Sequence, residues 1–138
     1  MQHTNQEYNF SNIILIESTF KRLPVVNFVS PEYKNDISIG IESQKEGNTL
    51  SVFLTVNVSS GNGDILDVEA KVKMAGIFQK NTEVNEIDMD SFGKVNAPAI
   101  IFPFIREHIA SISSKAGIPT ILLPPINFVK MAESETID

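Results

Sequence analysis

Residues 36–44 alternate apolar and polar side chains with a period of two, the pattern of a strand that has one buried face. The apolar positions are Ile37, Ile39 and Ile41. The same alternation recurs in residues 50–59 and 66–74, and short turns rich in glycine and asparagine separate the three segments. The pattern predicts a three-stranded antiparallel meander with one face toward solvent.

A fourth strand is predicted upstream, in residues 12–22, where the alternation is less regular. Ile13 and Leu15 would occupy one face, whereas the other face would carry Ile14, Ile16 and Phe20. Apolar residues on both faces indicate contact with more than the core of the same chain.

The second half of the chain changes to a helical period. Spacings of three and four define an apolar stripe, which predicts a helix over residues 98–115. The stripe consists of Ile101, Ile105, Ile109 and Ile112. Asn96 suits the N-cap, Pro98 the first turn and Gly117 the left-handed residue that ends a helix. Pro103 removes one backbone hydrogen bond, so we expect a kink at residues 99–102.

Three prolines then predict an extended connector, after which Asn127 can cap a short last helix. Strands followed by helices predict an α+β fold, a four-stranded antiparallel sheet with a long kinked helix and a short C-terminal helix packed on one face. We expect a single domain over residues 1–138, with disordered tails at residues 1–9 and 132–138.

Composition narrows the functional classes. The net charge of −6 disfavours nucleic acid and anionic membranes as partners, since lysine and arginine supply the binding energy there. The chain has no cysteine, its first residues do not resemble a signal peptide, and no apolar stretch approaches the ~20 residues of a membrane span. These observations predict a cytoplasmic protein without membrane insertion.

Candidate catalytic chemistry is sparse. The two histidines are His3, in a polar segment, and His108, on the predicted helix. Neither belongs to a metal-binding pattern, and the acidic residues Glu83, Glu86, Asp88 and Asp90 lack the order of a calcium loop. A small hydrolase using His108 with a serine is the alternative from the enzyme class, although no glycine-bounded nucleophile turn surrounds any serine.

Two linked motifs carry a family resemblance. Residues 96–117, NAPAIIFPFIREHIASISSKAG, resemble the main helix of SecB export chaperones, and residues 123–128, LPPINF, are similar to the connector that follows it. Residues 75–78, AGIF, resemble the segment that ends the family's fourth strand. The similarity extends over about residues 10–128.

The resemblance implies an ATP-independent holdase, without cofactor or enzymatic activity, that binds unfolded polypeptides, mainly preproteins for Sec-dependent export. It also implies a homotetramer built as a dimer of dimers. By position, the client-binding groove would be lined by Tyr33, Ile37, Ile39, Ile41, Phe128 and Met131. We expect the oligomer interface to use Ile13, Leu15, Ile101, Ile105, Ile109 and Ile112, and Arg106 and Glu107 to form structural ion pairs at a packed junction.

Two departures from the family pattern bear on partners. Lys71 and Lys73 lie on the strand expected to present an acidic docking face for the translocase motor SecA. The residues after Met131 are polar, which shortens the expected groove wall. A SecB-like chaperone dedicated to an antitoxin or another specific client is therefore the alternative to a general export chaperone.

Overall fold

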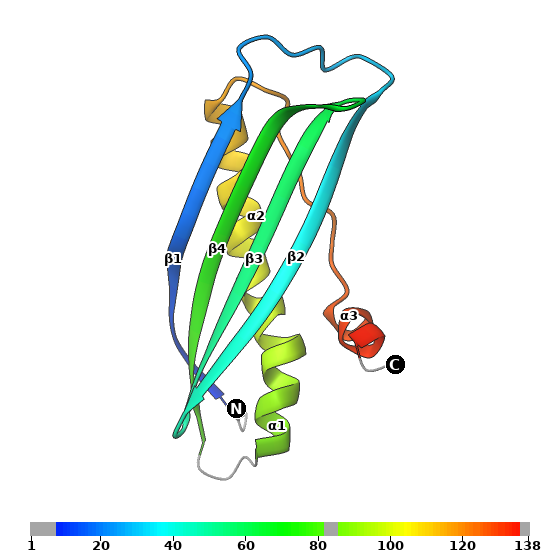
Figure 1. Cartoon of the computed structure of the whole chain (residues 1–138). Helices are drawn as coiled ribbons and strands as arrows, with labels where there is room; N and C mark the ends of the chain where they lie inside the picture. The colour runs from blue at the N-terminus through cyan, green and yellow to red at the C-terminus, as the bar shows by residue number, and fades with distance from the viewer. Residues whose placement is uncertain (1–7, 82–85, 136–138) are drawn as a thin grey trace, which may run out of the picture.

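The computed structural model describes residues 8–81 and 86–135 and contains four strands, each longer than the sequence pattern predicts. The strands are β1 (Tyr8–Arg22), β2 (Tyr33–Glu46), β3 (Thr49–Asn62) and β4 (Ile65–Lys80). All neighbouring strands are antiparallel, and the order in the sheet is β1-β4-β3-β2 (Figure 1). The first two strands of the chain therefore form opposite edges of the sheet.

The two predicted turns close the hairpins β2–β3 and β3–β4. Gly47 and Gly63 stand in these turns with φ values of 61° and 63°. This left-handed conformation strains residues with a side chain, so glycine suits both positions. β2 and β3 pair from Tyr33–Asn62 to Glu46–Thr49 without a register shift, whereas the pairing of β1 with β4 contains two irregularities.

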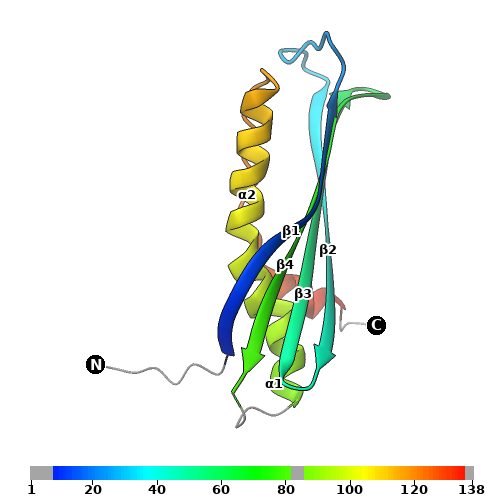
Figure 2. The same ribbon diagram turned by 90° about the vertical axis from the view of Figure 1, so that its left-hand side faces the viewer.

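The helical layer is a continuous rod on one face of the sheet (Figure 2). It comprises α1 (Glu86–Ser91), η1 (Phe92–Asn96), which is a π-helix, and α2 (Ala97–Lys115). The predicted N-cap is wrong, because Asn96 has helical dihedral angles and its side chain caps nothing. The helix ends as predicted, with Gly117 at φ 70°.

The irregular turn of the helical rod is η1, which precedes residues 99–102, where we expected a kink. The Ala97 amide donates to the carbonyl of Phe92, five residues back, and the next residue, Pro98, has no amide hydrogen to donate. A widened turn beside a proline is a common way to accommodate a missing helical hydrogen bond. α2 is helical throughout, including residues 99–102 before Pro103.

The core lies between this rod and the sheet. β3 and β4 direct alternate side chains toward α2, which meets them with Ile101, Ile105 and Ile109, each at most 1% exposed. Gly76 of β4 makes room for this contact, since a Cβ atom there would lie 2.9 Å from Cδ1 of Ile101. The predicted α+β layering is confirmed.

Residues 8–9 and 132–135, which we expected in disordered tails, belong to a strand and a helix. Tyr8 and Asn9 belong to β1, and the Tyr8 ring stacks on Phe92 with 3.9 Å between ring centroids. At the other end, Ala132–Glu135 belongs to α3 (Phe128–Glu135), whose predicted cap is confirmed because Asn127 Oδ1 accepts a 3.0 Å bond from the Lys130 amide. Residues 1–7 and 136–138 lie outside the described residues.

The acidic cluster considered as a metal site divides between two regions. Asp90 lies in α1 and its carboxylate pairs with Lys45 of β2 at 3.2 Å. Glu83 lies outside the described residues, and the described part of the chain holds no group of three or more acidic, histidine or cysteine residues that could bind a metal.

Candidate functional site

An apolar groove follows the edge strand β2 on the side of the sheet that carries the helix. α2 packs on β3 and β4, so the isoleucines on the core-facing side of β2 lie beside this helix and not beneath it. Ile39 and Ile41 are half-buried at the margin of the core, and Ile37 is 36% exposed. Because Ile37, Ile39 and Ile41 are two residues apart, they line one face of the strand along its length.

The upper pocket of this groove lies at the crossover end of β2. It has a volume of about 250 Å³ and is lined by Phe28, Tyr33, Asn35, Ile37, Pro119, Thr120, Ile121 and Leu122. Phe28 and Tyr33 meet edge to face with 5.3 Å between ring centroids, and Leu122 is 74% exposed. The pocket therefore combines aromatic walls with a freely accessible aliphatic side chain.

The lower pocket lies near α3, which flanks the lower half of β2 in Figure 1. Its volume is about 240 Å³, and its lining residues are Ile41, Ser43, Lys94, Met131 and Ala132. Ile39 lies between the two pockets on the same face of β2. Upper pocket, Ile39 and lower pocket together make up what we call the β2 groove.

Arg22 fixes the crossover, residues 23–32, that roofs the upper pocket. Its guanidinium donates to the carbonyls of Leu23 and Pro24, and through Nη1 to the carbonyl of Ala116 at 2.8 Å. The same group lies 5.9 Å from the centre of the Phe28 ring. One side chain thus joins the end of β1, the crossover and the end of α2.

Ser113 fixes the opposite wall, the connector of residues 116–127. Its hydroxyl, buried in α2, donates to the Ala110 carbonyl at 2.9 Å and accepts from the Ile121 amide at 3.0 Å. This pair of bonds holds the connector along the helix, so that Ile121 points into the core and Leu122 outward.

The structure brings five of the six predicted groove residues together. Tyr33 and Ile37 line the upper pocket, Ile41 and Met131 line the lower one, and Ile39 lies between them. Phe128 lies elsewhere. It is 5% exposed, packs edge to face on Phe102, and borders a separate hollow of about 360 Å³ beside the connector.

Six lining residues of the upper pocket were not assigned to the groove from the sequence: Phe28, Asn35, Pro119, Thr120, Ile121 and Leu122. The available signal for Phe28 was an aromatic residue in a connection bounded by Pro24 and Pro31. Asn35 comes just before the predicted strand, residues 36–44, and carries no pattern of its own. Their common position at one end of β2 arises only when crossover and connector fold against the sheet.

The predicted oligomer interface is wrong for three of its four helix residues. Ile101, Ile105 and Ile109 are fully buried in the core of this chain, so they have no surface left for a second copy. Ile112 is partly buried and Ile13 packs at the margin of the core, whereas Leu15 is 49% exposed. The large apolar side chains exposed on β1 and on the outer side of α2 are Phe10, Ile14, Leu15, Ile16, Ile100 and Phe104.

The predicted structural ion pairs of Arg106 and Glu107 are not found within the described chain. Both residues are exposed on α2, and neither has an ion-pair partner among residues 8–81 and 86–135. The reason is geometric: the helix packs through its isoleucine stripe, which leaves positions 106 and 107 on the side facing away from the sheet.

His108 connects the helix with β1. Its Nε2 atom lies 2.9 Å from Oγ of Ser18, in an exposed position. Ser113, near the end of the same helix, does not take this place, because its hydroxyl bonds to Ala110 and Ile121. Within the described residues His108 has no carboxylate partner, which a catalytic triad requires on the second ring nitrogen.

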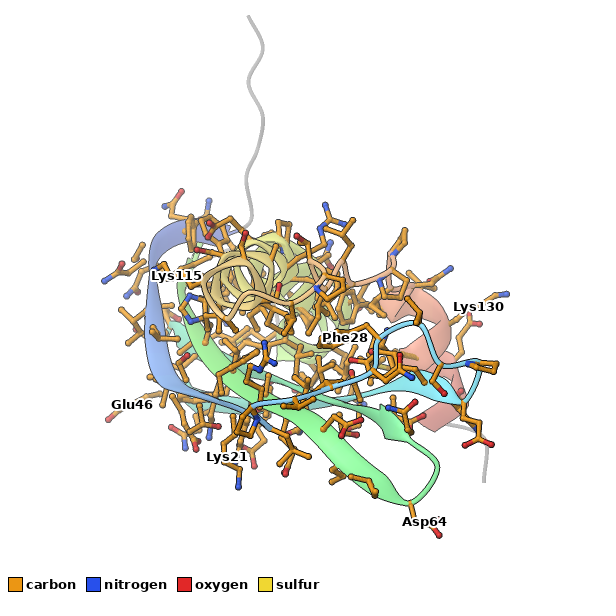
Figure 3. All side chains as sticks on the ribbon, turned by 90° about the horizontal axis from the view of Figure 1, so that it is seen from above. Lys21, Phe28, Glu46, Asp64, Lys115 and Lys130 are labelled. Atoms are coloured by element: carbon orange, nitrogen blue, oxygen red, sulfur yellow. The ribbon has the colours of Figure 1, made fainter. Side chains whose placement is uncertain are left out.

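The face of the sheet away from the helix carries charges of both signs, and Figure 3 shows Lys21 on that side. Lys71 pairs with Glu17 at 3.5 Å and Lys73 with Glu42 at 3.8 Å. Lys73 also lies 5.4 Å from the centre of the Phe53 ring. Exposed pairs of this kind contribute at most about 1 kcal/mol, but they neutralise part of the acidic charge on this face.

The sequence matches the model of the family "SecB: Preprotein translocase subunit SecB" over residues 17–136. This match includes β2, the connector and all of α3, the elements that form the β2 groove. The chain belongs to the SecB family. The sequence analysis predicted an export chaperone, and the curated relatives are named protein-export proteins.

Curated SecB relatives agree over most of this chain. The protein-export protein SecB of Halorhodospira halophila is 29% identical over 133 residues, covering 94% of this chain and 76% of that protein. The SecB of Methylobacillus flagellatus is 35% identical over 99 residues, covering 72% and 62%. The SecB of Maricaulis maris is covered over 58% of its length. The chain therefore spans less than two thirds of several of these SecB proteins.

A solved structure shows the same fold. The SecB-like chaperone Rv1957 of Mycobacterium tuberculosis, determined with a ChAD peptide from the antitoxin HigA1, superposes with a TM-score of 0.78. The alignment covers 88% of this chain and 91% of that one at 12% identity. The SecB-like architecture is thus confirmed, and among the residues described no helix is both long and apolar enough to span a membrane.

Proposed function

We propose that this SecB-family chain is an ATP-independent holdase that binds unfolded or non-native polypeptides in the β2 groove, with preproteins for Sec-dependent export as its clients. The observation that carries the proposal is an apolar groove along an edge strand. Its two pockets are open to solvent on a SecB fold, and nothing in their lining resembles a catalytic centre.

The groove suits clients that share no sequence. Unfolded chains have in common only apolar side chains and a free backbone, so a receptor for many of them needs apolar pockets in a row. Ile37, Ile39 and Ile41 supply such a row along β2, which pairs with β3 without a register shift, and the pockets at its ends are wide enough for single side chains. No nucleotide is needed, because weak contacts can form and break spontaneously.

Replacing Ile37 and Leu122 together by serine tests this proposal. Both side chains line the upper pocket and neither belongs to the core, so the fold should survive. We expect roughly tenfold weaker binding of an unfolded client, about 1.4 kcal/mol, because other contacts share the client. Suppression of client aggregation and the dissociation constant for a fluorescent unfolded protein measure the loss.

The matched control replaces Ile65 and Leu66, an exposed apolar pair at the β3–β4 turn that lines neither pocket. Serine at these two positions should leave client binding unchanged. Equal binding by the groove variant and the wild type would place the client elsewhere, and absence of binding by the wild type would refute the holdase function.

We also infer a cytoplasmic homotetramer, a dimer of dimers. The exposed apolar side chains of β1 and outer α2 support this assembly, since a monomer rarely leaves so many large apolar groups uncovered along one edge. Arg106 and Glu107, which have no ion-pair partner in the part of the chain that the structure describes, are available for ion pairs between subunits.

The assembly should depend on Ile100 and Phe104. Glutamate at both positions is expected to yield smaller species in light scattering at micromolar concentration, because it would bury two charges without partners. Ser114→Glu, on the same helix and exposed, is the control that should leave the mass unchanged. A wild-type protein that is monomeric under these conditions would contradict the assembly itself.

A second candidate function is that of a chaperone dedicated to one client such as an antitoxin. Two observations favour it. The fold matches a SecB-like chaperone solved with an antitoxin peptide. On the sheet face away from the helix, Lys71 and Lys73 pair with Glu17 and Glu42, which lowers the acidic charge that the family resemblance leads us to expect for SecA docking. A panel of unrelated unfolded proteins distinguishes the two. A general export holdase binds them with similar affinity, whereas a dedicated chaperone prefers one.

A further inference from the structure

The upper pocket contains one polar side chain whose orientation is fixed by a buried neighbour. Asn35 lies directly opposite Ser60 in the pairing of β2 with β3. Ser60 is 1% exposed, and its hydroxyl donates to Oδ1 of Asn35. This bond uses one of the two lone pairs of the Asn35 carbonyl oxygen and turns that oxygen toward the sheet.

This bond determines which group Asn35 offers to the pocket. With Oδ1 held by Ser60, the amide nitrogen Nδ2 and its two hydrogens remain, and within the described residues they donate to no protein group. Asn35 is exposed and lines the pocket. The other polar lining residues, Tyr33 and Thr120, carry hydroxyls that can turn and either donate or accept.

We propose that Asn35 Nδ2 donates a hydrogen bond to a main-chain carbonyl of a polypeptide held in the upper pocket. This inference rests on the proposed function and adds to it a residue that recognises the peptide backbone. Asn35 makes the pocket selective for an extended polypeptide over an apolar molecule of similar size.

The physical reason is the cost of burying a backbone carbonyl. An extended segment that places a side chain among Phe28, Tyr33 and Ile37 also brings its own backbone between apolar walls. A carbonyl that loses water there without gaining a donor costs about 1–3 kcal/mol. A pre-oriented amide donor removes this cost for any sequence, because every residue has a carbonyl.

Two variants and two probes test the proposal in the full-length protein. The probes are an unstructured peptide of alternating leucine and serine, and N-phenylnaphthylamine, a neutral apolar dye without a carbonyl group. Asn35→Leu keeps the approximate size and removes both donors. Asn35→Asp removes the donors but keeps an oxygen for Ser60 to bond, so at least one variant retains the local packing.

We expect both variants to bind the peptide about 3- to 10-fold more weakly, the equivalent of one hydrogen bond. Asn35→Leu should bind the dye as tightly as the wild type or more tightly. Asn57→Leu, on the opposite face of β3, is the matched control and should change neither affinity. Thermal unfolding of each variant verifies that the fold is intact.

Three outcomes would overturn the inference. Unchanged or tighter peptide binding by Asn35→Leu shows that the pocket is purely apolar. Equal weakening of peptide and dye shows that Asn35 only shapes the pocket. Both outcomes leave the holdase function standing. A wild-type protein that binds the dye but no peptide refutes the proposed function, and this inference with it.

Discussion

Ile105→Ala is expected to lower the free energy of unfolding by about 2–5 kcal/mol. Ile105 is completely buried between the helical rod and the sheet, one turn from Ile101 and Ile109. Alanine removes three carbon atoms from a packed interior, and the strands on one side and the helix on the other cannot close the space. Urea unfolding followed by circular dichroism measures the change.

The matched substitution is Ile100→Ala, five positions away on the same helix. Ile100 is 38% exposed, so within the protomer its truncation should cost less than about 1 kcal/mol. Comparing these two variants distinguishes a core residue from an interface residue. If Ile105→Ala left the unfolding midpoint unchanged but reduced the molecular mass, the original assignment of this residue to a subunit interface would be right and its burial in the core wrong.

Gly61→Ala should destabilise the protein by about 3 kcal/mol, at the upper end of the range for overpacking. A Cβ atom at Gly61 would lie 1.9 Å from the carbonyl oxygen of Ile65. The obstacle is backbone, which cannot swing aside as a flexible side chain can. The strain would fall where β3 meets β4 out of register, at the turn that precedes the buried Asp67.

Gly40→Ala is the control for the loss of a glycine from a strand. A Cβ atom at Gly40 has no neighbour within 4 Å, so alanine should be neutral or slightly stabilising, because it restricts the unfolded chain. Melting temperatures of the two variants, measured side by side, decide the point. A Gly61→Ala protein as stable as Gly40→Ala would contradict the close approach at the β3–β4 turn.

Much of the candidate site followed from local pattern. The alternation of Ile37, Ile39 and Ile41 identified a strand with one apolar face, and the motifs around the long helix indicated the family to which the chain belongs. Asn127 and Gly117 fulfilled their predicted roles at helix ends, since capping depends on a few neighbouring residues. Such features are decided by interactions within one or two turns of the chain.

Other features required contacts between distant segments. Asn96 has a favourable side chain for a cap, yet the helix continues through it, because Phe92 packs on Tyr8 and Phe78 across the sheet and holds the upstream turn in place. Likewise, Phe28 becomes part of the upper pocket only because Arg22 ties the crossover to the end of α2. Tertiary packing overrides a local preference worth about 1 kcal/mol.

The sequence by itself predicted the four strands, the long helix and the short last helix, their apolar positions and the family that the motifs resemble, but not α1 and η1. Only the tertiary structure decided what covers each apolar face. Ile101, Ile105 and Ile109 are covered by the sheet of their own chain, Ile37 and Leu122 remain open, and Phe128 lies outside the β2 groove. The physical reason is that the hydrophobic effect is not directional. The sequence pattern indicates which side chains are buried, whereas the tertiary structure decides which surface covers them.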